Sequence, residues 1–328
     1  MPHAHHDILL SIVRKKIPLS RHGLAVLALL APVLLAQPTN RPADLLPLRS
    51  VYFVRNDPDW MAITSDGVWV AVNHANKVVR LDAGTNRIGV SAAVKDPCSG
   101  LAADFGSLWV PSCGEHALVR MDATTGERQA VIPAAPADSE GGIATGAGSV
   151  WLVTSESGEL TRVDAATNTI RARIPIPAGS FNPLFAYGAV WVTSHKGGTL
   201  LRIDPATSKV TDQIPVGPEP RFLAAGAGSL WVLNQGNGTV ARVNASTRRL
   251  VATIPAHIPG HGGDIAFGAD AVWATLIGTP LTRIDPATNR VTSQWHGEGG
   301  DEVRFGFGSL WLTHIKAGFV WRLNVPHP

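Results

Sequence analysis

Charged and histidine side chains suited to binding chemistry gather in two short segments late in the chain. One segment holds Asp301, Glu302 and Arg304, and the other holds His261 and Asp264. Carboxylates and imidazoles are ligands for divalent cations, and a guanidinium pairs with acidic ligands. Three further side chains complete the set of candidate ligand- or metal-binding residues: His195, Arg221 and His314.

The same side chains have a plainer interpretation, in which Asp301, Glu302 and Arg304 form a solvated ion-pair cluster. The sequence offers no motif that would assign a catalytic residue. It contains no Gly-x-Ser-x-Gly or His-Glu-x-x-His motif, and no Gly-x-Gly-x-x-Gly or Walker loop. We therefore assign no catalytic residue, and we treat the eight side chains as candidates for contact with a ligand or metal.

These candidates stand out against an internal repeat. Strings of the type Gly-Ser-Leu-Trp-Val recur seven times, and an Arg follows each Trp by ten or eleven residues. A residue type present in every copy indicates architecture, so we assign these tryptophans to packing between the units. They are spaced 38 to 42 residues apart, at Trp69, Trp109, Trp151, Trp191, Trp231, Trp273 and Trp311.

Each repeat unit contains four short apolar runs bounded by turn residues, and these predict four antiparallel strands. Such units at a period of about 40 residues are typical of β-propeller blades. The sequence therefore predicts an all-β fold, a seven-bladed β-propeller of four-stranded blades over residues 51–328. The last unit stops after its third strand, at residues 319–324. We expect an N-terminal strand at 51–54 to complete the last blade and close the ring.

The N-terminal segment differs from the repeats. Residues 1–36 combine four basic side chains with an apolar run at 24–36, which is typical of a signal peptide, although an uncleaved N-terminal anchor stays open. Residues 37–50, with three prolines between 37 and 48, look like a tether. We expect export to the periplasm or the extracellular space, with no membrane span in the mature domain. The net charge of +3 comes from residues 1–36, since 24 basic and 24 acidic residues remain beyond them; no nucleic-acid partner is expected.

The two cysteines, Cys98 and Cys113, flank the expected first hairpin of the second blade. If the turn lies at residues 105–106, directly opposed residues have numbers that sum to 211, as these two do. Cross-strand neighbours are close to the spacing of a disulfide. We predict a structural disulfide, which an exported protein would retain; two free thiols are the alternative.

The repeat resembles the YVTN-type and virginiamycin B lyase-like (streptogramin lyase) propellers over the whole of residues 51–328. The resemblance lies in Gly-Ser-Leu-Trp-Val, in Asp-Pro-Ala-Thr-Asn and in Ile-Pro-Val-Gly at 214–217. It implies a seven-bladed propeller. The lyase of that family opens a cyclic depsipeptide antibiotic by elimination, with Mg²⁺, histidines and a glutamate on one face.

The residues that this resemblance assigns to chemistry are not found at the matching positions. The family's histidines lie about ten residues before the Trp or its equivalent, and its glutamate lies four residues after the last Trp. The glutamate position is Ile315 here. The histidine positions are Asp59, Ser99, Gly141, Phe181, Arg221, Gly263 and Asp301.

Two functional hypotheses follow. The first is a monomeric, exported propeller that binds a small ligand or a protein partner on its loop face, without the lyase's catalytic His and Glu. The alternative is a lyase or hydrolase that uses a divalent cation such as Mg²⁺ in the funnel, held by residues among the eight candidates.

Overall fold

The computed structural model describes residues 38–138, 140 and 142–327, which belong to one compact unit. The predicted signal peptide or anchor at 1–36 lies outside these residues. In the described part of the chain, no helix is long and apolar enough to cross a membrane.

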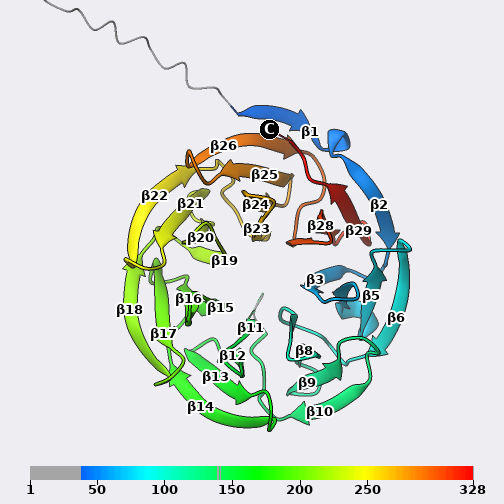
Figure 1. Ribbon diagram of the computed structural model, residues 1–328, viewed down its shortest axis with the longest axis vertical. Helices are drawn as coiled ribbons and strands as arrows, with labels where there is room; N and C mark the ends of the chain where they lie inside the picture. Colours follow the sequence, from blue (N-terminus) through cyan, green and yellow to red (C-terminus); the bar gives the residue numbers. More distant parts are fainter. Residues whose placement is uncertain (1–37, 139, 141, 328) are drawn as a thin grey trace, which may run out of the picture. The chain divides into compact units, whose positions relative to one another are not determined.

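Seven sheets surround a central axis, and each forms a blade of four antiparallel strands (Figure 1). In six blades the four strands follow the chain from the axis outward, whereas the outermost strand of the last blade comes from the N-terminal part of the chain. The sheet of blade six has a fifth strand on its outer edge. The innermost strands are β3 (Pro58–Ile63), β7 (Ala102–Asp104), β11 (Ile143–Gly146), β15 (Ser180–Ala186), β19 (Pro220–Gly226), β23 (Ile265–Gly268) and β27 (Val303–Gly306). The second strands are β4 (Val68–Val72), β8 (Ser107–Ser112), β12 (Ser149–Ser155), β16 (Ala189–Ser194), β20 (Ser229–Asn234), β24 (Ala271–Leu276) and β28 (Ser309–His314). The seven-bladed propeller predicted from the repeat is confirmed.

The outer half of each blade is equally regular. The third strands are β5 (Lys77–Asp82), β9 (Ala117–Asp122), β13 (Glu159–Asp164), β17 (Thr199–Asp204), β21 (Thr239–Asn244), β25 (Thr279–Asp285) and β29 (Phe319–Asn324). The fourth strands are β6 (Arg87–Ala93), β10 (Arg128–Ile132), β14 (Thr169–Pro175), β18 (Lys209–Pro215), β22 (Arg249–Pro255), β26 (Arg290–His296) and, in the last blade, β2 (Leu48–Phe53). Short 3-10 helices lie at Ala43–Leu45 (η1) and Asn73–Ala75 (η2).

The N-terminal strand closes the ring as expected. β2 pairs antiparallel with β29, with Val51 opposite Trp321 and Phe53 opposite Phe319. The first described strand, β1 (Thr39–Pro42), pairs in parallel with β26 of blade six, where the sequence had suggested a tether. Arg41 lies over the ring of Trp295, 5.5 Å from its centroid. Thus the described part of residues 37–50 packs on the outer edges of blades six and seven.

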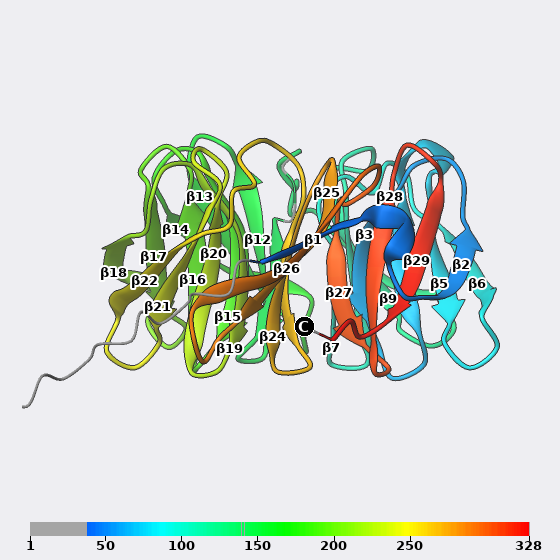
Figure 2. The same ribbon diagram turned by 90° about the horizontal axis from the view of Figure 1, so that it is seen from above.

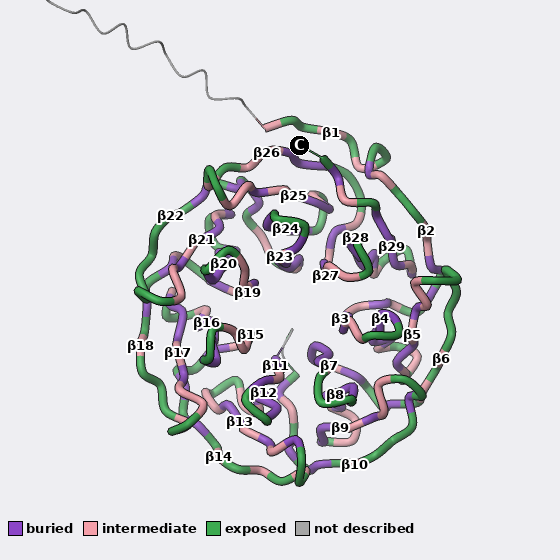
Figure 3. Tube along the Cα trace, in the orientation of Figure 1, coloured by how far each residue is buried: buried purple, intermediate pink, exposed green. Residues whose placement is uncertain are grey.

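The repeat tryptophans form the core between the blades. All seven are fully buried, and each is paired across the sheet with a repeat arginine of the third strand, as in Trp151 opposite Arg162. The guanidinium of Arg162 lies 4.9 Å from the Trp151 ring centroid and donates to the carbonyl of Pro205 in the next blade, at 2.6 Å. Among the described residues, five of the seven repeat arginines donate to a carbonyl of the next blade in this way, whereas Arg202 and Arg283 donate to a Thr of their own blade. Burial is concentrated in the inner strands, whereas the fourth strands are largely exposed (Figure 3).

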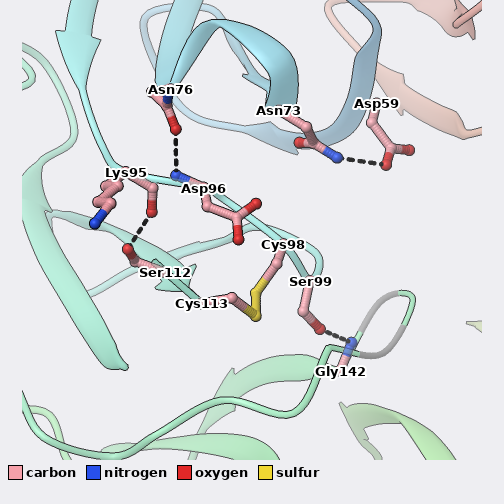
Figure 4. The surroundings of a disulfide bond; sticks show 10 residues. All are labelled: Asp59, Asn73, Asn76, Lys95, Asp96, Cys98, Ser99, Ser112, Cys113 and Gly142. Atoms are coloured by element: carbon pink, nitrogen blue, oxygen red, sulfur yellow. Dashed lines mark hydrogen bonds between the residues drawn. A yellow bond between two sulfur atoms is a disulfide. The ribbon is translucent and has the colours of Figure 1, made fainter. Parts of the chain in front are cut away.

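The disulfide between Cys98 and Cys113 is present, with Cα atoms 5.7 Å apart (Figure 4). Within the hairpin the expected register holds, since Ala102 lies opposite Trp109. Beyond it the register shifts by two, because Pro97 lies opposite Ser112. The disulfide thus fixes an irregular loop in front of β7 rather than a regular strand pair.

Candidate functional site

Two classes of loop meet at one face of the ring, which Figure 2 shows edge-on. One class joins a fourth strand to the next inner strand, and the other joins a second strand to its third strand. A cavity of about 550 Å³ is lined by both classes, with Glu140 and His261 from the first and His195 and Gln235 from the second. We call this cavity and an adjoining one of about 300 Å³ the funnel. They share Asp59, Trp60, Glu140 and His261.

The positions that correspond to the family's histidines supply much of the funnel lining. Asp59 is the second residue of β3, and Arg221 is the second residue of β19. Asp301 lies two residues before β27. Each comes from the same point of its repeat, so the sevenfold symmetry directs all of them to one face. Asp59 and Arg221 line the larger cavity, and Asp59 and Asp301 line the smaller one.

Arg221 is the cation of the larger cavity. Its guanidinium carbon lies 3.8 Å from the ring centroid of Phe181, and Nη2 donates to Oε2 of Glu140 at 3.2 Å. Nε is buried and has no hydrogen-bond partner among the described residues. Burial lowers the pKa of Arg221, whereas the negative charge of Glu140 acts to raise it. A guanidinium over an aromatic ring gains a cation–π interaction and can still donate N–H groups to an acidic group.

Asp59 and Asp301 form a carboxyl pair that joins the first blade to the last. Both side chains line the smaller part of the funnel, where the negative charge of Asp301 disfavours ionisation of Asp59. Asn73 Nδ2 donates to Asp59 at 3.3 Å (Figure 4), and the Gly263 N–H donates to Asp301 at 3.2 Å. Burial, with the charge of Glu140, raises the pKa of Asp301 to about 6. Burial and the charge of Asp301 raise the pKa of Asp59 well above its usual value.

Asp264, Glu302 and Arg304 form a separate cluster at the central channel. Arg304 pairs with Asp264, and its Nη2 lies 2.6 Å from Oε1 of Glu302. Burial acts to lower the pKa of Arg304, but the two carboxylates outweigh this effect and raise the pKa. Burial raises the pKa of Asp264 and raises that of Glu302 well above its usual value, although Arg304 acts in the opposite direction on both.

This cluster occupies the Arg304 guanidinium and so bears on whether it can bind an acidic ligand. Arg304 lies opposite Trp311, in the ring of small inner-strand residues that includes Ala62 opposite Trp69. With Asp264 it lines a channel cavity of about 370 Å³. The sequence had suggested that Arg304 could hold an acidic ligand. In the structure its guanidinium is already paired with two carboxylates of its own chain.

The three candidate histidines lie in different surroundings. His195 lines the larger cavity beside Arg221, and burial and the Arg221 charge lower its pKa. His261 is exposed and lines both parts of the funnel. His314 is buried against Phe319 and Trp321, with ring centroids 4.7 and 5.3 Å away, and it lines a different cavity of about 640 Å³. Burial lowers the pKa of His314.

Among the described residues, the funnel lining offers no three free side-chain ligands close enough to hold one cation. Within the part of the chain that the structure describes, one group of three potential ligand atoms is close enough to hold a single ion: Cys98, Cys113 and Asp138. Two of its members are joined in the disulfide. The family's Mg²⁺ therefore has no matching set of three side-chain ligands here, and we derive no chemical step through it.

The funnel lining includes residues that were not among the eight candidates, among them three that contact or perturb Arg221 or Asp301: Asp59, Phe181 and Glu140. Asp59 and Phe181 occupy the same repeat position as Arg221 and Asp301, so comparing that position across the seven units could have revealed them. Glu140 lies in the loop before β11, where the sequence carries no repeat signal. Its role is visible from its ion pair with Arg221 and from its effect on the pKa values of Asp59 and Asp301.

Comparison with known proteins supports the fold. The family model described as outer membrane protein assembly factor BamB matches residues 114–270. None of the curated proteins matches the chain significantly. A streptogramin B lyase structure superposes with a TM-score of 0.69 at 20% identity, covering 86% of this chain and 96% of the other.

Two further solved structures are similar. Virginiamycin B lyase from Staphylococcus aureus has a TM-score of 0.65 at 16% identity, covering 83% of this chain and 96% of the lyase. BamB from Moraxella catarrhalis has a TM-score of 0.59 at 12% identity, covering 81% of this chain and 84% of BamB. Identities this low show the fold alone. In its fold, the chain is a virginiamycin B lyase-like β-propeller.

Proposed function

We propose that this protein is an exported β-propeller that binds a small ligand in the funnel on its loop face. The observation that carries the proposal is the convergence of Arg221 and the Asp59–Asp301 pair on one lining, each from a position where the other blades carry different residues. Ligand sites are concave and combine apolar walls with a few convergent polar groups. Buried Trp60 and Phe222, with ring centroids 6.1 Å apart, supply the apolar wall.

Export is supported by the disulfide, which persists in oxidising compartments. A protein partner on the same face is the other form of this hypothesis, and the BamB-like fold favours it. We favour a small ligand because the polar groups line concave cavities of about 550 and 300 Å³, a size that suits a small molecule.

The test is a thermal-stability screen of the purified full-length protein against a small-molecule library. A ligand that binds only the folded state stabilises it by about 2.7 kcal/mol at one hundred times its Kd. We expect some compounds to stabilise the wild type and to lose this effect in Arg221→Ala, but to keep it in Arg171→Ala, a matched change at an exposed outer strand. No stabilising compound, or equal stabilisation of both variants, would contradict the proposal.

A lyase or hydrolase is the second candidate, favoured by one observation. Asp59 and Asp301 line the same cavity and both have raised pKa values, about 6 for Asp301, so the pair can exchange a proton near neutral pH. A divalent cation bound by these carboxylates, with water completing its shell, remains part of this candidate. Stabilisation by Mg²⁺, Mn²⁺, Ca²⁺ or Zn²⁺ that EDTA reverses and Asp301→Asn abolishes would support it. Unchanged stability with all four cations would count against it.

A further inference from the structure

The funnel has two chemically different ends on one continuous lining. Arg221 lines the larger cavity, Asp301 lines the smaller one, and Asp59 lines both. Glu140 lines both cavities and pairs with Arg221, and its charge also raises the pKa of both aspartates. The buried rings of Trp60 and Phe222 line the smaller cavity together with the aspartates.

The Arg221 end has unused donor capacity. A guanidinium carries five N–H donors in a fixed fork that fits a carboxylate with two parallel hydrogen bonds. Among the described residues, the Arg221 side chain donates a single hydrogen bond, from Nη2 to Glu140 at 3.2 Å. The Glu140 side chain is 54% exposed, whereas that of Arg221 is 13% exposed. Glu140 therefore occupies the site through a weak single contact that a better-fitting carboxylate can replace.

The charge balance of the funnel excludes a simple anion. Four side chains of the larger cavity are acidic, namely Asp59, Asp138, Glu140 and Glu156, and Asp301 adds a fifth in the smaller cavity. Even with Asp59 protonated, these outnumber the single guanidinium of Arg221. A ligand with only a negative charge would be repelled by this surplus, whereas a ligand that also carries a cation is attracted.

We propose that the funnel binds a zwitterionic amino acid or short peptide, with its carboxylate in place of Glu140 on Arg221 and its ammonium group at the Asp59–Asp301 pair. This inference rests on the proposed function and adds the chemical class of the ligand. Glu140 acts in it as an internal competitor that holds Arg221 until the ligand arrives. The Trp60 and Phe222 rings cover the apolar part of the ligand between its charged ends.

The experiment is a calorimetric titration of the full-length protein with Gly-Xaa dipeptides, where Xaa is Ala, Leu, Phe or Lys. The strongest binder is then compared with its N-acetylated and C-amidated forms. We expect each blocked form to bind at least tenfold more weakly. Arg221→Lys keeps the charge but loses the fork, so it should weaken the free acid at least tenfold and leave the amide unchanged. Asp301→Asn should weaken the free amine and leave the N-acetyl form unchanged.

Glu140→Gln supplies a test that does not depend on replacing Arg221. Removing the competitor should tighten dipeptide binding at least threefold, whereas the exposed control Glu127→Gln should change nothing. Failure of every dipeptide to bind at 5 mM, or equal affinity for free and amidated forms, overturns the inference. If other compounds bind in the funnel and depend on Arg221, the proposed function stands without this ligand class. If no compound binds in the funnel, the proposed function and this ligand class are both contradicted.

Discussion

The Asp59–Asp301 pair makes the stability of the ring depend on pH. Asp301 has its pKa raised from 3.8 to about 6 in the folded protein, mainly by burial. A carboxyl group with a raised pKa binds its proton more tightly in the folded state than in the unfolded state. The folded state is therefore favoured at low pH, and this advantage is lost as the pH rises from about 4 through 6. Asp301→Asn removes the ionisation while keeping an oxygen that can accept the Gly263 N–H.

The expected change in the free energy of unfolding follows from the pKa change. A rise from 3.8 to about 6 corresponds to about 3 kcal/mol, at about 1.4 kcal/mol per pKa unit. Partial solvent access reduces this figure, so we expect Asp301→Asn to raise the free energy of unfolding by about 1–3 kcal/mol at pH 8. At pH 4 the wild-type Asp301 is already protonated when folded, so the variant should differ from the wild type by less than about 0.5 kcal/mol.

The assay is urea unfolding followed by tryptophan fluorescence, with the disulfide intact, at half-unit steps from pH 4 to pH 8. Asp270→Asn, at the exposed hairpin between β23 and β24, is the matched control and should leave the pH profile unchanged. Two results would refute the reasoning: a profile for Asp301→Asn parallel to that of the wild type, or a loss of stability in this variant at pH 8.

Three further outcomes follow from the architecture. Deleting residues 51–55 removes half of the six-residue strand that pairs with β29, and it should prevent stable folding; unchanged melting of the truncated protein would contradict this. Replacing both Cys98 and Cys113 by Ala opens a link across 15 residues and should lower the free energy of unfolding by about 3 kcal/mol. Denaturation curves of the oxidised, reduced and double-Ala proteins measure it, and coincident curves would count against it. Arg304→Met leaves two buried carboxylates without their cation, so it should cost about 3–5 kcal/mol at pH 8 and less at pH 5, where they can protonate. Equal losses at both pH values would argue that Arg304 does not hold their charge.

The repeat made the scaffold predictable, because each unit carries its own tryptophan, turn residues and strand pattern. Strand β1 could not be predicted in the same way. Its four residues, Thr39–Pro42, have no counterpart in the repeat and no alternating pattern. Their pairing with β26 depends on where the outer edge of blade six lies in space, which local sequence does not encode.

The candidate site was predictable in its members but not in its grouping. Asp301, Glu302 and Arg304 are neighbours in sequence, yet Asp301 lines the funnel while the other two meet in the channel cluster. Side chains alternate between the two faces of an extended chain, so adjacent residues are directed apart. Asp59 joins Asp301 only because the ring brings its first and last blades together, a contact between residues 242 positions apart in the sequence.

The central claim is that the funnel is the binding site of this propeller. It is tested most directly by the position of a stabilising compound in crystals of the full-length protein grown with that compound. The account predicts ligand density in contact with Arg221 and beside the Asp59–Asp301 pair, with Glu140 displaced from the guanidinium. Density confined to the opposite face or to the outer strands, with the Glu140–Arg221 contact intact, would contradict it.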